Sequence, residues 1–351
     1  MSQNIACKNY DIFFGDWEGL NSLLGEDYSM RMVIVDENTE KFCLPVLLEK
    51  TNHIFYPIVI PAGEEYKNIS TAQYIWAEML RLGADRHSIC INLGGGVIGD
   101  MGGWTAASFM RGMEFIQLPT TLLSMVDASV GGKLGIDFHG IKNIIGLIKD
   151  PKAVFIFTEF LGSLSYELMR SGFAEVIKHG LIKDTSYWNT IKNINLNECK
   201  NWDDLVRKSV MIKKEVTEAD PYERGLRKIL NFGHTIGHAI ESLSFNHEIP
   251  LLHGEAIAIG MIIEAHISLQ NNLISHNELE EITEFITGIY GIMPAYIPDL
   301  EQALPLMRKD KKNKGGQIRF SLLKHIGECL FDQVVGEKQI KTALQYYKSL
   351  K

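Results

Sequence analysis

The segment over residues 88–103 limits the choice of fold more than any other part of the chain. An apolar run over residues 88–93 leads directly into the glycine pattern Gly94-x-Gly96-x-x-Gly99. Glycines at the end of a strand let the backbone approach a pyrophosphate closely, and the N-terminus of the following helix favours negative charge. We expect Gly102 and Gly103 to open that helix. The segment therefore predicts a dinucleotide site; the alternative is a tight turn that binds no ligand.

Apolar, β-branched runs alternate with helical patterns through the first half of the chain. Residues 71–82 show helical spacing of apolar side chains, with Ser70 or Thr71 as the expected N-cap. Asp36, the best strand-end acid, precedes the glycines, whereas the usual ribose-binding acid follows them. The alternation predicts an α/β domain with a parallel-rich sheet over residues 1–160. Its expected strands are 32–36, 56–60, 88–93, 114–118 and 153–157.

Helical periodicity replaces this alternation near residue 160. We find no internal repeat and no linker rich in proline or serine. The pattern predicts an all-α C-terminal domain over residues 161–351. Its expected helices are 172–181, 202–217, 233–242, 255–269 and 278–290.

The chain of 351 residues carries a formal net charge of −8. An acidic balance argues against a protein that coats nucleic acid or anionic membrane, but it does not describe a local pocket. The five cysteines contain no C-x-x-C pair, which favours a reducing cytosol. No signal peptide is recognisable, and no apolar run approaches the ~20 residues that span a bilayer. We expect a soluble cytoplasmic protein that binds neither nucleic acid nor membrane.

Glu175, His234, His238 and His253 form a second group of candidate functional residues. His234 and His238 are four residues apart, so both imidazoles lie on one face of a predicted helix. Glu175 lies on another helix, with Lys178 on the same face, and His253 stands just ahead of a third. Two imidazoles and one carboxylate with an open position are typical of a catalytic zinc site. Alternatively, these histidines form structural hydrogen bonds in a helical core.

A third set of candidates is mainly basic and is spread along the chain. Such residues are surface charges by default. Gathered in one cleft, they would bind phosphate and carboxylate groups. Distance along the chain does not show whether they gather. The set comprises Arg111, Asp127, Lys133, Lys142, Asn143, Lys213, Arg227, Asn231, Lys311 and Lys312.

These features belong to a series of motifs that occur in one order between about residues 30 and 330. The motifs are Leu93-Gly-Gly-Gly-Val-Ile-Gly-Asp100, Arg111-Gly112, Pro119-Thr-Thr-Leu-Leu123, Val126-Asp127 through Gly131-Gly-Lys133, Lys142-Asn143, Ala174-Glu-Val-Ile-Lys178, Leu230-Asn-Phe-Gly-His-Thr-Ile-Gly-His238, His253-Gly-Glu255 and Asp310-Lys-Lys312. Together they closely resemble the 3-dehydroquinate synthase family of the sugar-phosphate cyclase superfamily.

The resemblance implies an NAD-binding α/β domain and a helical domain with one divalent metal ion, zinc or cobalt. The implied reaction converts 3-deoxy-D-arabino-heptulosonate 7-phosphate (DAHP) to 3-dehydroquinate and phosphate, in the shikimate pathway of aromatic amino acid biosynthesis. NAD oxidises C5, phosphate is eliminated, and the hydride returns before ring opening and intramolecular aldol closure. The resemblance also implies a homodimer in which Arg111 reaches the neighbouring subunit's phosphate site.

The resemblance also assigns roles to single residues. Glu175, His234 and His253 would hold the metal. The catalytic residues would be Lys133, Lys178, His238 and Asp127, with His238 near the phosphate rather than on the metal. Substrate contacts would come from Arg111, Asn143, Lys213, Arg227, Asn231, Lys311 and Lys312. NAD contacts would come from Asp36, Asn38, Glu64, Lys67, Gly95, Gly96, Val97, Asp100, Thr120, Thr121, Asp127, Lys133 and Lys142.

The chain departs from the family pattern near residues 134–141 and 163–170. The usual Gly-Gly-Lys-Thr-Gly is Gly131-Gly-Lys-Leu-Gly135 here, and Leu-Pro-x-Arg-Glu is Leu164-Ser-Tyr-Glu-Leu168. We therefore expect altered loop geometry in both places.

Other functions remain open beside the one that the resemblance implies. They are a related cyclase acting on glucose 6-phosphate, such as 2-deoxy-scyllo-inosose synthase, or on sedoheptulose 7-phosphate; a metal-dependent polyol dehydrogenase; and a non-catalytic NAD-binding protein. Lys213 and Arg227 are suited to a substrate carboxylate. They favour DAHP, because a neutral sugar would leave their charge uncompensated in a pocket.

Overall fold

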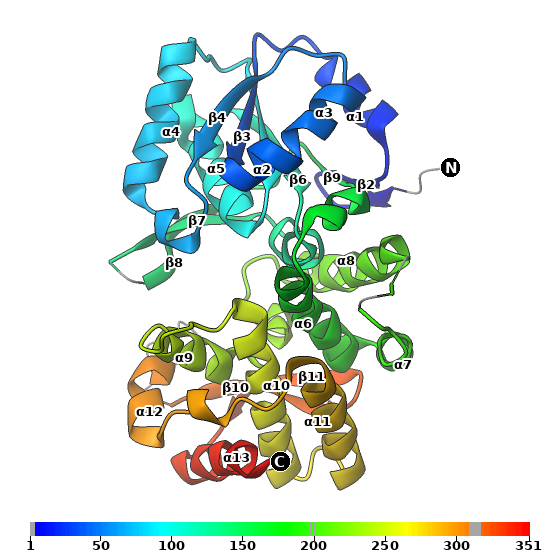
Figure 1. The fold of residues 1–351 in the computed structure, drawn as a ribbon, viewed down its shortest axis with the longest axis vertical. Helices are drawn as coiled ribbons and strands as arrows, with labels where there is room; N and C mark the ends of the chain where they lie inside the picture. Colours follow the sequence, from blue (N-terminus) through cyan, green and yellow to red (C-terminus); the bar gives the residue numbers. More distant parts are fainter. Residues whose placement is uncertain (1–3, 140, 197, 200, 309–316) are drawn as a thin grey trace. The chain divides into compact units, whose positions relative to one another are not determined.

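The computed structural model describes residues 4–139, 141–196, 198–199, 201–308 and 317–351 (Figure 1). The chain forms two compact units. The first unit contains residues 1–165 and 201–214, and the second contains residues 166–200 and 215–351. The domain boundary predicted at residue 160 stays a prediction.

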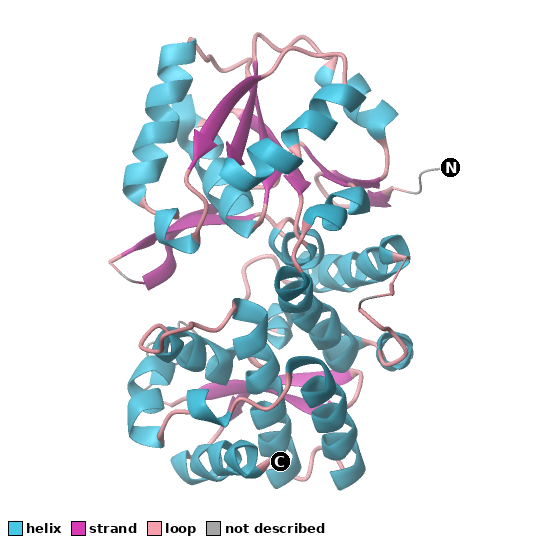
Figure 2. Ribbon diagram, in the orientation of Figure 1, coloured by secondary structure: helices cyan, strands magenta, loops and turns pink. Residues whose placement is uncertain are grey.

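A seven-stranded sheet forms the centre of the first unit, in the order β1-β2-β9-β6-β5-β3-β4 (Figure 2). Every neighbouring pair is parallel except β1 and β2, which confirms the predicted parallel-rich sheet. Each of the five predicted runs forms a strand. The strands are β1 (Ile5–Ala6), β2 (Asp11–Phe14), β3 (Arg31–Asp36), β4 (Tyr56–Ile60), β5 (Ile89–Gly94), β6 (Glu114–Pro119) and β9 (Ala153–Ile156).

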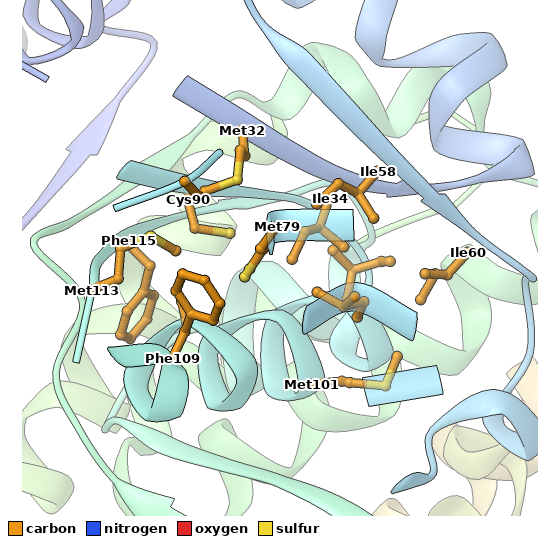
Figure 3. Close-up of a cluster of buried hydrophobic side chains, with 14 of the residues drawn as sticks. Met32, Ile34, Ile58, Ile60, Met79, Cys90, Met101, Phe109, Met113 and Phe115 are labelled. Carbon is orange, nitrogen blue, oxygen red and sulfur yellow. The ribbon is translucent and has the colours of Figure 1, made fainter. Parts of the chain in front are cut away.

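Helices of the first unit pack on this sheet. Ile34, Cys90 and Phe115 from three strands pack with Met79 of α4 and Met101 of α5 in one buried apolar cluster (Figure 3). The core therefore fixes the carboxyl ends of these strands relative to the helices that follow them. The helices are α1 (Trp17–Leu24), α2 (Glu37–Phe42), α3 (Leu44–Lys50), α4 (Ile69–Leu82), α5 (Gly96–Ser108) and the first part of α8 (Trp202–Ala219).

The expected N-cap of α4 is wrong. The Asn68 side chain caps this helix, because its Oδ1 accepts hydrogen bonds from the backbone N–H groups of Ser70 (3.0 Å) and Thr71 (3.1 Å). An amide oxygen two or three residues ahead of these donors satisfies them better than their own short side chains do.

The expected start of α5 is also wrong, since the helix begins at Gly96 and runs through Gly102 and Gly103. A Cβ atom on Gly102 would lie 2.2 Å from Asn92 Oδ1, and one on Gly103 would lie 2.5 Å from Leu134 Cδ2. These two glycines therefore lie inside the helix and not at its start. They allow the helix to pack closely on the neighbouring strands.

A two-stranded antiparallel hairpin, β7 (Lys133–Phe138) and β8 (Ile141–Ile148), completes the first unit and was not predicted. It contains the first of the two segments that depart from the family pattern. Short turns connect the larger elements of the chain. They are η1 (Glu64–Tyr66), η2 (Phe109–Arg111), η3 (Ser124–Ala128), η4 (Thr158–Ser163), η5 (Leu226–Asn231) and η6 (Pro294–Tyr296).

The second unit is mostly helical, as predicted, and α10 lies at its centre. This helix contacts α6, α9, α11, α13 and β10, and most of its residues are buried. The hairpin β10–β11 was not predicted. None of the described helices is both long and apolar enough to cross a membrane. The elements are α6 (Tyr166–Lys183), α7 (Thr185–Ile191), α9 (His234–Ser244), α10 (His253–Gln270), α11 (His276–Tyr290), α12 (Leu300–Arg308), β10 (Arg319–His325), β11 (Glu328–Val334) and α13 (Glu337–Ser349).

Candidate functional site

The carboxyl ends of β3, β4, β5 and β6 form one edge of the sheet in the first unit. The chain runs from β3 outward to β4 and returns to β5 on the other side of β3, so the strand order reverses between β3 and β5. Ligands of doubly wound sheets bind in the crevice at this point. Asp36 ends β3, Gly94 ends β5, and Thr120 directly follows β6.

The glycine segment at this edge forms the N-terminus of α5. Gly95 is the N-cap residue, and no side chain caps the helix there. A Cβ atom on Gly94 would lie 2.5 Å from Ile98 Cγ1, and one on Gly95 would lie 3.3 Å from Thr121 Cγ2. Glycines therefore expose the first backbone N–H groups of α5, and helix N-termini of this kind bind pyrophosphate.

Asp36 has a local structural role in addition to its predicted contact with NAD. Its Oδ1 accepts hydrogen bonds from the backbone N–H groups of Asn38 (3.0 Å) and Thr39 (2.8 Å) and so caps α2. The cap fixes this carboxylate at the end of β3.

Four residues predicted to bind NAD gather in an ionic cluster. Lys67 Nζ lies 2.7 Å from Asp100 Oδ2 and 3.9 Å from Glu64 Oε1, and Lys142 Nζ lies 4.0 Å from the same Glu64 oxygen. Lys67 is only 3% exposed. Burial raises the pKa of Asp100, and the neighbouring Lys67 ammonium opposes this rise. The cluster thus depends on the pairing of two largely buried charges.

Replacing Asp100 with asparagine should destabilise the protein by about 3–5 kcal/mol, because it leaves the buried Lys67 ammonium without its charged partner. Urea unfolding of the purified variant measures this loss. The matched change Glu64→Gln removes a more exposed partner at 3.9 Å and should cost no more than about 1 kcal/mol. Equal losses in the two variants would contradict the central role of the Lys67–Asp100 pair.

Two further residues that were predicted separately, Asp127 and Lys213, form an ion pair in the first unit. Lys213, on α8, donates to Asp127 Oδ1 (2.5 Å) and to the Asp127 backbone oxygen (2.6 Å). Lys213 is 6% exposed, so its aliphatic stem is covered and its ammonium is held in one place. The pair therefore holds the Lys213 ammonium in a fixed position beside the short π-helix η3.

Three other predicted residues of this unit are exposed. Lys133 begins β7, and the backbone N–H of Asn143 donates to Asp137 Oδ1 at 2.7 Å. Arg111 lies in the left-handed backbone region, with a φ of 71°. Exposure of these cationic and polar groups is compatible with binding an anionic substrate.

Glu175, His234 and His253 lie together in the second unit and come from three different helices. Glu175 is on α6, while His234 and His253 are the first residues of α9 and α10. Glu175 Oε1 lies 3.6 Å from His234 Nε2 and 4.0 Å from His253 Nε2. Three ligands bound to one zinc ion, each at about 2.0–2.2 Å, have separations of this size.

The chemistry of these donors also fits a divalent cation. Glu175 is 1% exposed, and its carboxylate oxygens make no hydrogen bond within the described part of the chain, although Lys178 forms an ion pair with it. Lys178 pairs with Oε2, whereas Oε1 is the oxygen near the two histidines and is therefore the one suited to a metal ion. His234 Nδ1 lies 3.2 Å from the Phe232 carbonyl oxygen, a contact that metal-binding histidines commonly make.

Close helix packing positions the three ligands. A Cβ atom on Gly254 would lie 2.0 Å from the Ser171 carbonyl oxygen, and one on Gly260 would lie 2.0 Å from that of Gly233. The backbone of α10 therefore meets α6 and the start of α9 at glycines. This packing sets the separation of the ligands before any metal binds.

Glu264, on α10, was not predicted and supports the start of α9. It is fully buried, and its carboxylate accepts hydrogen bonds from the backbone N–H groups of Gly233 (2.7 Å) and Ile236 (3.0 Å). It therefore acts as an N-cap supplied by a different helix and holds His234 in place. An acidic residue in the middle of an apolar helix was the sequence signal that could have identified it.

The remaining predicted residues of the second unit take separate positions. The His238 ring centroid lies 5.0 Å from that of His234. Arg227 is buried, and its Nη1 donates to the Pro221 carbonyl oxygen (2.8 Å). Asn231 Nδ2 donates to Glu223 Oε1 (2.5 Å). Arg227 and Asn231 share the turn η5. Lys311 and Lys312 lie outside the described residues.

Comparison with known proteins covers almost the whole chain. A model described as "3-dehydroquinate synthase N-terminal" matches residues 57–171, and one described as "3-dehydroquinate synthase C-terminal" matches residues 172–313. A 3-dehydroquinate synthase of Parabacteroides distasonis is 40% identical over 347 residues, which are 98% of this chain and 97% of the relative.

Solved structures share the fold. A 2-deoxy-scyllo-inosose synthase, complexed with carbaglucose-6-phosphate, NAD+ and Co2+, has a TM-score of 0.84 and 24% identity over 99% of both chains. The 2-epi-5-epi-valiolone synthase ValA of Streptomyces hygroscopicus subsp. jinggangensis, with NAD+ and Zn2+ bound, has a TM-score of 0.82 and 23% identity over 99% of both chains. At these identities the likeness establishes the fold alone.

Proposed function

Because this chain belongs to the 3-dehydroquinate synthase family, we propose that it converts DAHP to 3-dehydroquinate and phosphate with NAD and one divalent metal ion, zinc or cobalt. It is a phosphate-eliminating carbon–oxygen lyase of the shikimate pathway, which serves aromatic amino acid biosynthesis. The observation that carries this conclusion is the 40% identity to a synthase of the same name over 98% of the chain.

The two cofactors supply the redox chemistry in this proposal. When bound, NAD would supply reversible acceptance of the C5 hydride, and the metal ion would supply Lewis-acid stabilisation of the hydroxyl group that is oxidised. The N-terminus of α5 would hold the NAD pyrophosphate, with the ionic cluster of Glu64, Lys67, Asp100 and Lys142 beside it. Glu175, His234 and His253 would hold the metal ion.

The protein's own residues would mainly bind and orient the substrate. In the first unit, the ammonium of Lys213, held by Asp127, is suited to bind a substrate anion such as the carboxylate. In the second unit, the guanidinium of Arg227 is suited to the same kind of group. In the first unit, Lys133 and Asn143 would contact the phosphate and hydroxyl groups of the substrate. In the second unit, His238 would be a separate contact for such groups. Lys178 would stabilise negative charge that develops near the metal.

The remaining steps make little demand on protein acid–base chemistry. Oxidation at C5 acidifies the neighbouring C6 proton, and the substrate's own phosphate takes that proton as it leaves. No strong protein base is therefore needed. Ring opening and aldol closure proceed within the site after the hydride has returned to C5.

Phosphate release from different sugar phosphates tests the substrate. The purified protein, supplied with NAD and Co2+, should release phosphate from DAHP and none above background from glucose 6-phosphate or sedoheptulose 7-phosphate. Lys213 and Arg227 are the physical reason, since each is a largely buried cation whose interaction with an anionic carboxylate is favourable and is missing for a sugar phosphate that has no carboxylate. Release from glucose 6-phosphate without release from DAHP would overturn the proposal and favour a 2-deoxy-scyllo-inosose synthase.

We also propose a homodimer in the cytoplasm. Arg111 is exposed, and its neighbours Met110 (φ 48°) and Gly112 (φ 123°) both have a positive φ. Its exposed side chain supports the proposal that it contacts a second copy of the chain. Among the described residues the five cysteines form no disulfide bond, which supports a reducing compartment. Sedimentation should give about twice the chain mass of 39.6 kDa, and a mass of one chain would contradict the dimer.

A further inference from the structure

Glu241 is a buried carboxylate on α9 that is absent from the set of predicted site residues. It is 5% exposed, and its Oε2 lies 3.3 Å from His253 Nδ1. The opposite ring nitrogen of His253, Nε2, lies 4.0 Å from Glu175 Oε1. The imidazole of His253 therefore stands between two buried carboxylates.

The position of Glu241 is unfavourable for an anion unless a hydrogen-bond donor compensates it. Glu241 lies in the last turn of α9, which ends at Ser244. The C-terminal end of a helix carries partial negative charge, which repels a carboxylate. Burial adds a desolvation cost. A contact with the Nδ1–H group of His253 offsets both costs.

We propose that Glu241 is a positioning residue of the metal centre. Its carboxylate accepts a hydrogen bond from Nδ1 of His253, which fixes the rotation of the ring and places the proton on Nδ1. The lone pair of Nε2 is then available to the metal ion that Glu175 would also bind. This inference rests on the metal site proposed above.

The two histidine ligands differ in this respect. The partner of His234 Nδ1 is the neutral carbonyl oxygen of Phe232, whereas His253 has the charged carboxylate of Glu241. A carboxylate partner increases the basicity of a histidine ligand, and loss of such partners typically lowers metal affinity by roughly 10–100-fold. Glu241 therefore strengthens the His253 ligand in particular.

A different use of the same atoms makes an opposing prediction. Ligand atoms of His238, Glu241 and His253 also lie within 4.8 Å of one another, and such a group could hold a second ion. In that case His253 Nδ1 would be a metal ligand instead of a hydrogen-bond donor. The wild-type protein would then bind two ions per chain.

The test measures Co2+ affinity in the full-length protein by competition with a chelator. Glu241→Ala should weaken Co2+ binding by roughly 10–100-fold. Glu241→Gln keeps an oxygen acceptor without the charge and should recover part of this loss. Saturating Co2+ should restore most of kcat in both variants, and the visible spectrum of the bound Co2+ should shift in Glu241→Ala. A merely structural role would not produce this graded change in affinity.

Glu255 offers a matched control. It is 9% exposed and lies two residues from His253, but its carboxylate pairs with Arg170 and accepts from the backbone N–H of Leu252 (2.9 Å). Glu255→Gln should lower the melting temperature and keep the wild-type Co2+ affinity. A loss of affinity equal to that of Glu241→Ala would overturn the specific role of Glu241.

Other results also separate the two proposals. Wild-type affinity in Glu241→Ala, or two Co2+ ions per wild-type chain, would overturn the role of Glu241 while the metal site stands. Retention of stoichiometric metal by His253→Ala would instead overturn the metal site itself. If Glu241→Ala fails to fold, the nearly isosteric Glu241→Gln provides the test. An unchanged Co2+ affinity in Glu241→Gln would contradict a contribution from the carboxylate charge.

Discussion

Replacing His253 with alanine should remove the bound divalent ion and lower kcat/KM for DAHP by on the order of 10³-fold or more. The change deletes one of the three proposed ligand atoms, which are Glu175 Oε1, His234 Nε2 and His253 Nε2. A metal ion contributes several kcal/mol of charge stabilisation in the transition state, and each ~1.4 kcal/mol is tenfold in rate. Elemental analysis and phosphate-release kinetics of the purified variant measure the two losses.

His247 provides the control for this experiment. It is an exposed histidine of the same unit, and its ring packs on Tyr296 at a centroid distance of 4.5 Å. His247→Ala should keep one ion per chain and near-normal kcat/KM. Stoichiometric metal in His253→Ala would contradict the assignment of the ligands.

Gly254→Ala should destabilise the protein and release the metal ion, although the change adds only one methyl group. The new Cβ atom would lie 2.0 Å from the Ser171 carbonyl oxygen, so α10 has to move away from α6. That movement separates His253 on α10 from Glu175 on α6. We expect a loss of about 1–3 kcal/mol in the free energy of unfolding, the usual cost of overpacking. Urea unfolding and metal analysis measure both effects.

Gly288, inside α11, is the matched glycine because a Cβ atom there would meet no heavy atom within 4 Å beyond its chain neighbours and the nearby backbone of its own helix. Gly288→Ala should raise the free energy of unfolding by about 0.4–1 kcal/mol, since alanine restricts the unfolded chain. If Gly254→Ala behaves like Gly288→Ala, the close approach of α6 and α10 does not position the metal ligands.

The periodicity of apolar residues predicted the strands and helices that bury an apolar face. The β-branched runs form five strands of the central sheet. The segments with helical periodicity form main helices of the second unit. Glycines were harder to interpret, since Gly95 is the N-cap residue of α5, where we propose that NAD binds, while Gly102 allows helix packing. Both roles require glycine, so the sequence alone does not separate them. The atoms around each glycine in the structure do.

In the candidate site, too, local spacing predicted some features, and packing between helices determined the others. The four-residue spacing placed His234 and His238 on one helix face, but the structure groups His234 with Glu175 and His253, which come from other helices. Proximity between helices is a property of packing, so periodicity could not predict it, and only the family motifs assigned these ligands. Glu241 and Glu264 were missed because their roles depend on backbone and ring atoms of neighbouring segments.

The most direct measurement follows phosphate, 3-dehydroquinate and NADH in one reaction with DAHP in large excess over NAD. A synthase that recycles its cofactor should convert all of the DAHP to equal amounts of phosphate and 3-dehydroquinate, with no accumulation of NADH. A reaction that stops when the NAD is consumed, with NADH formed in equal amount, would contradict this function and indicate a polyol dehydrogenase.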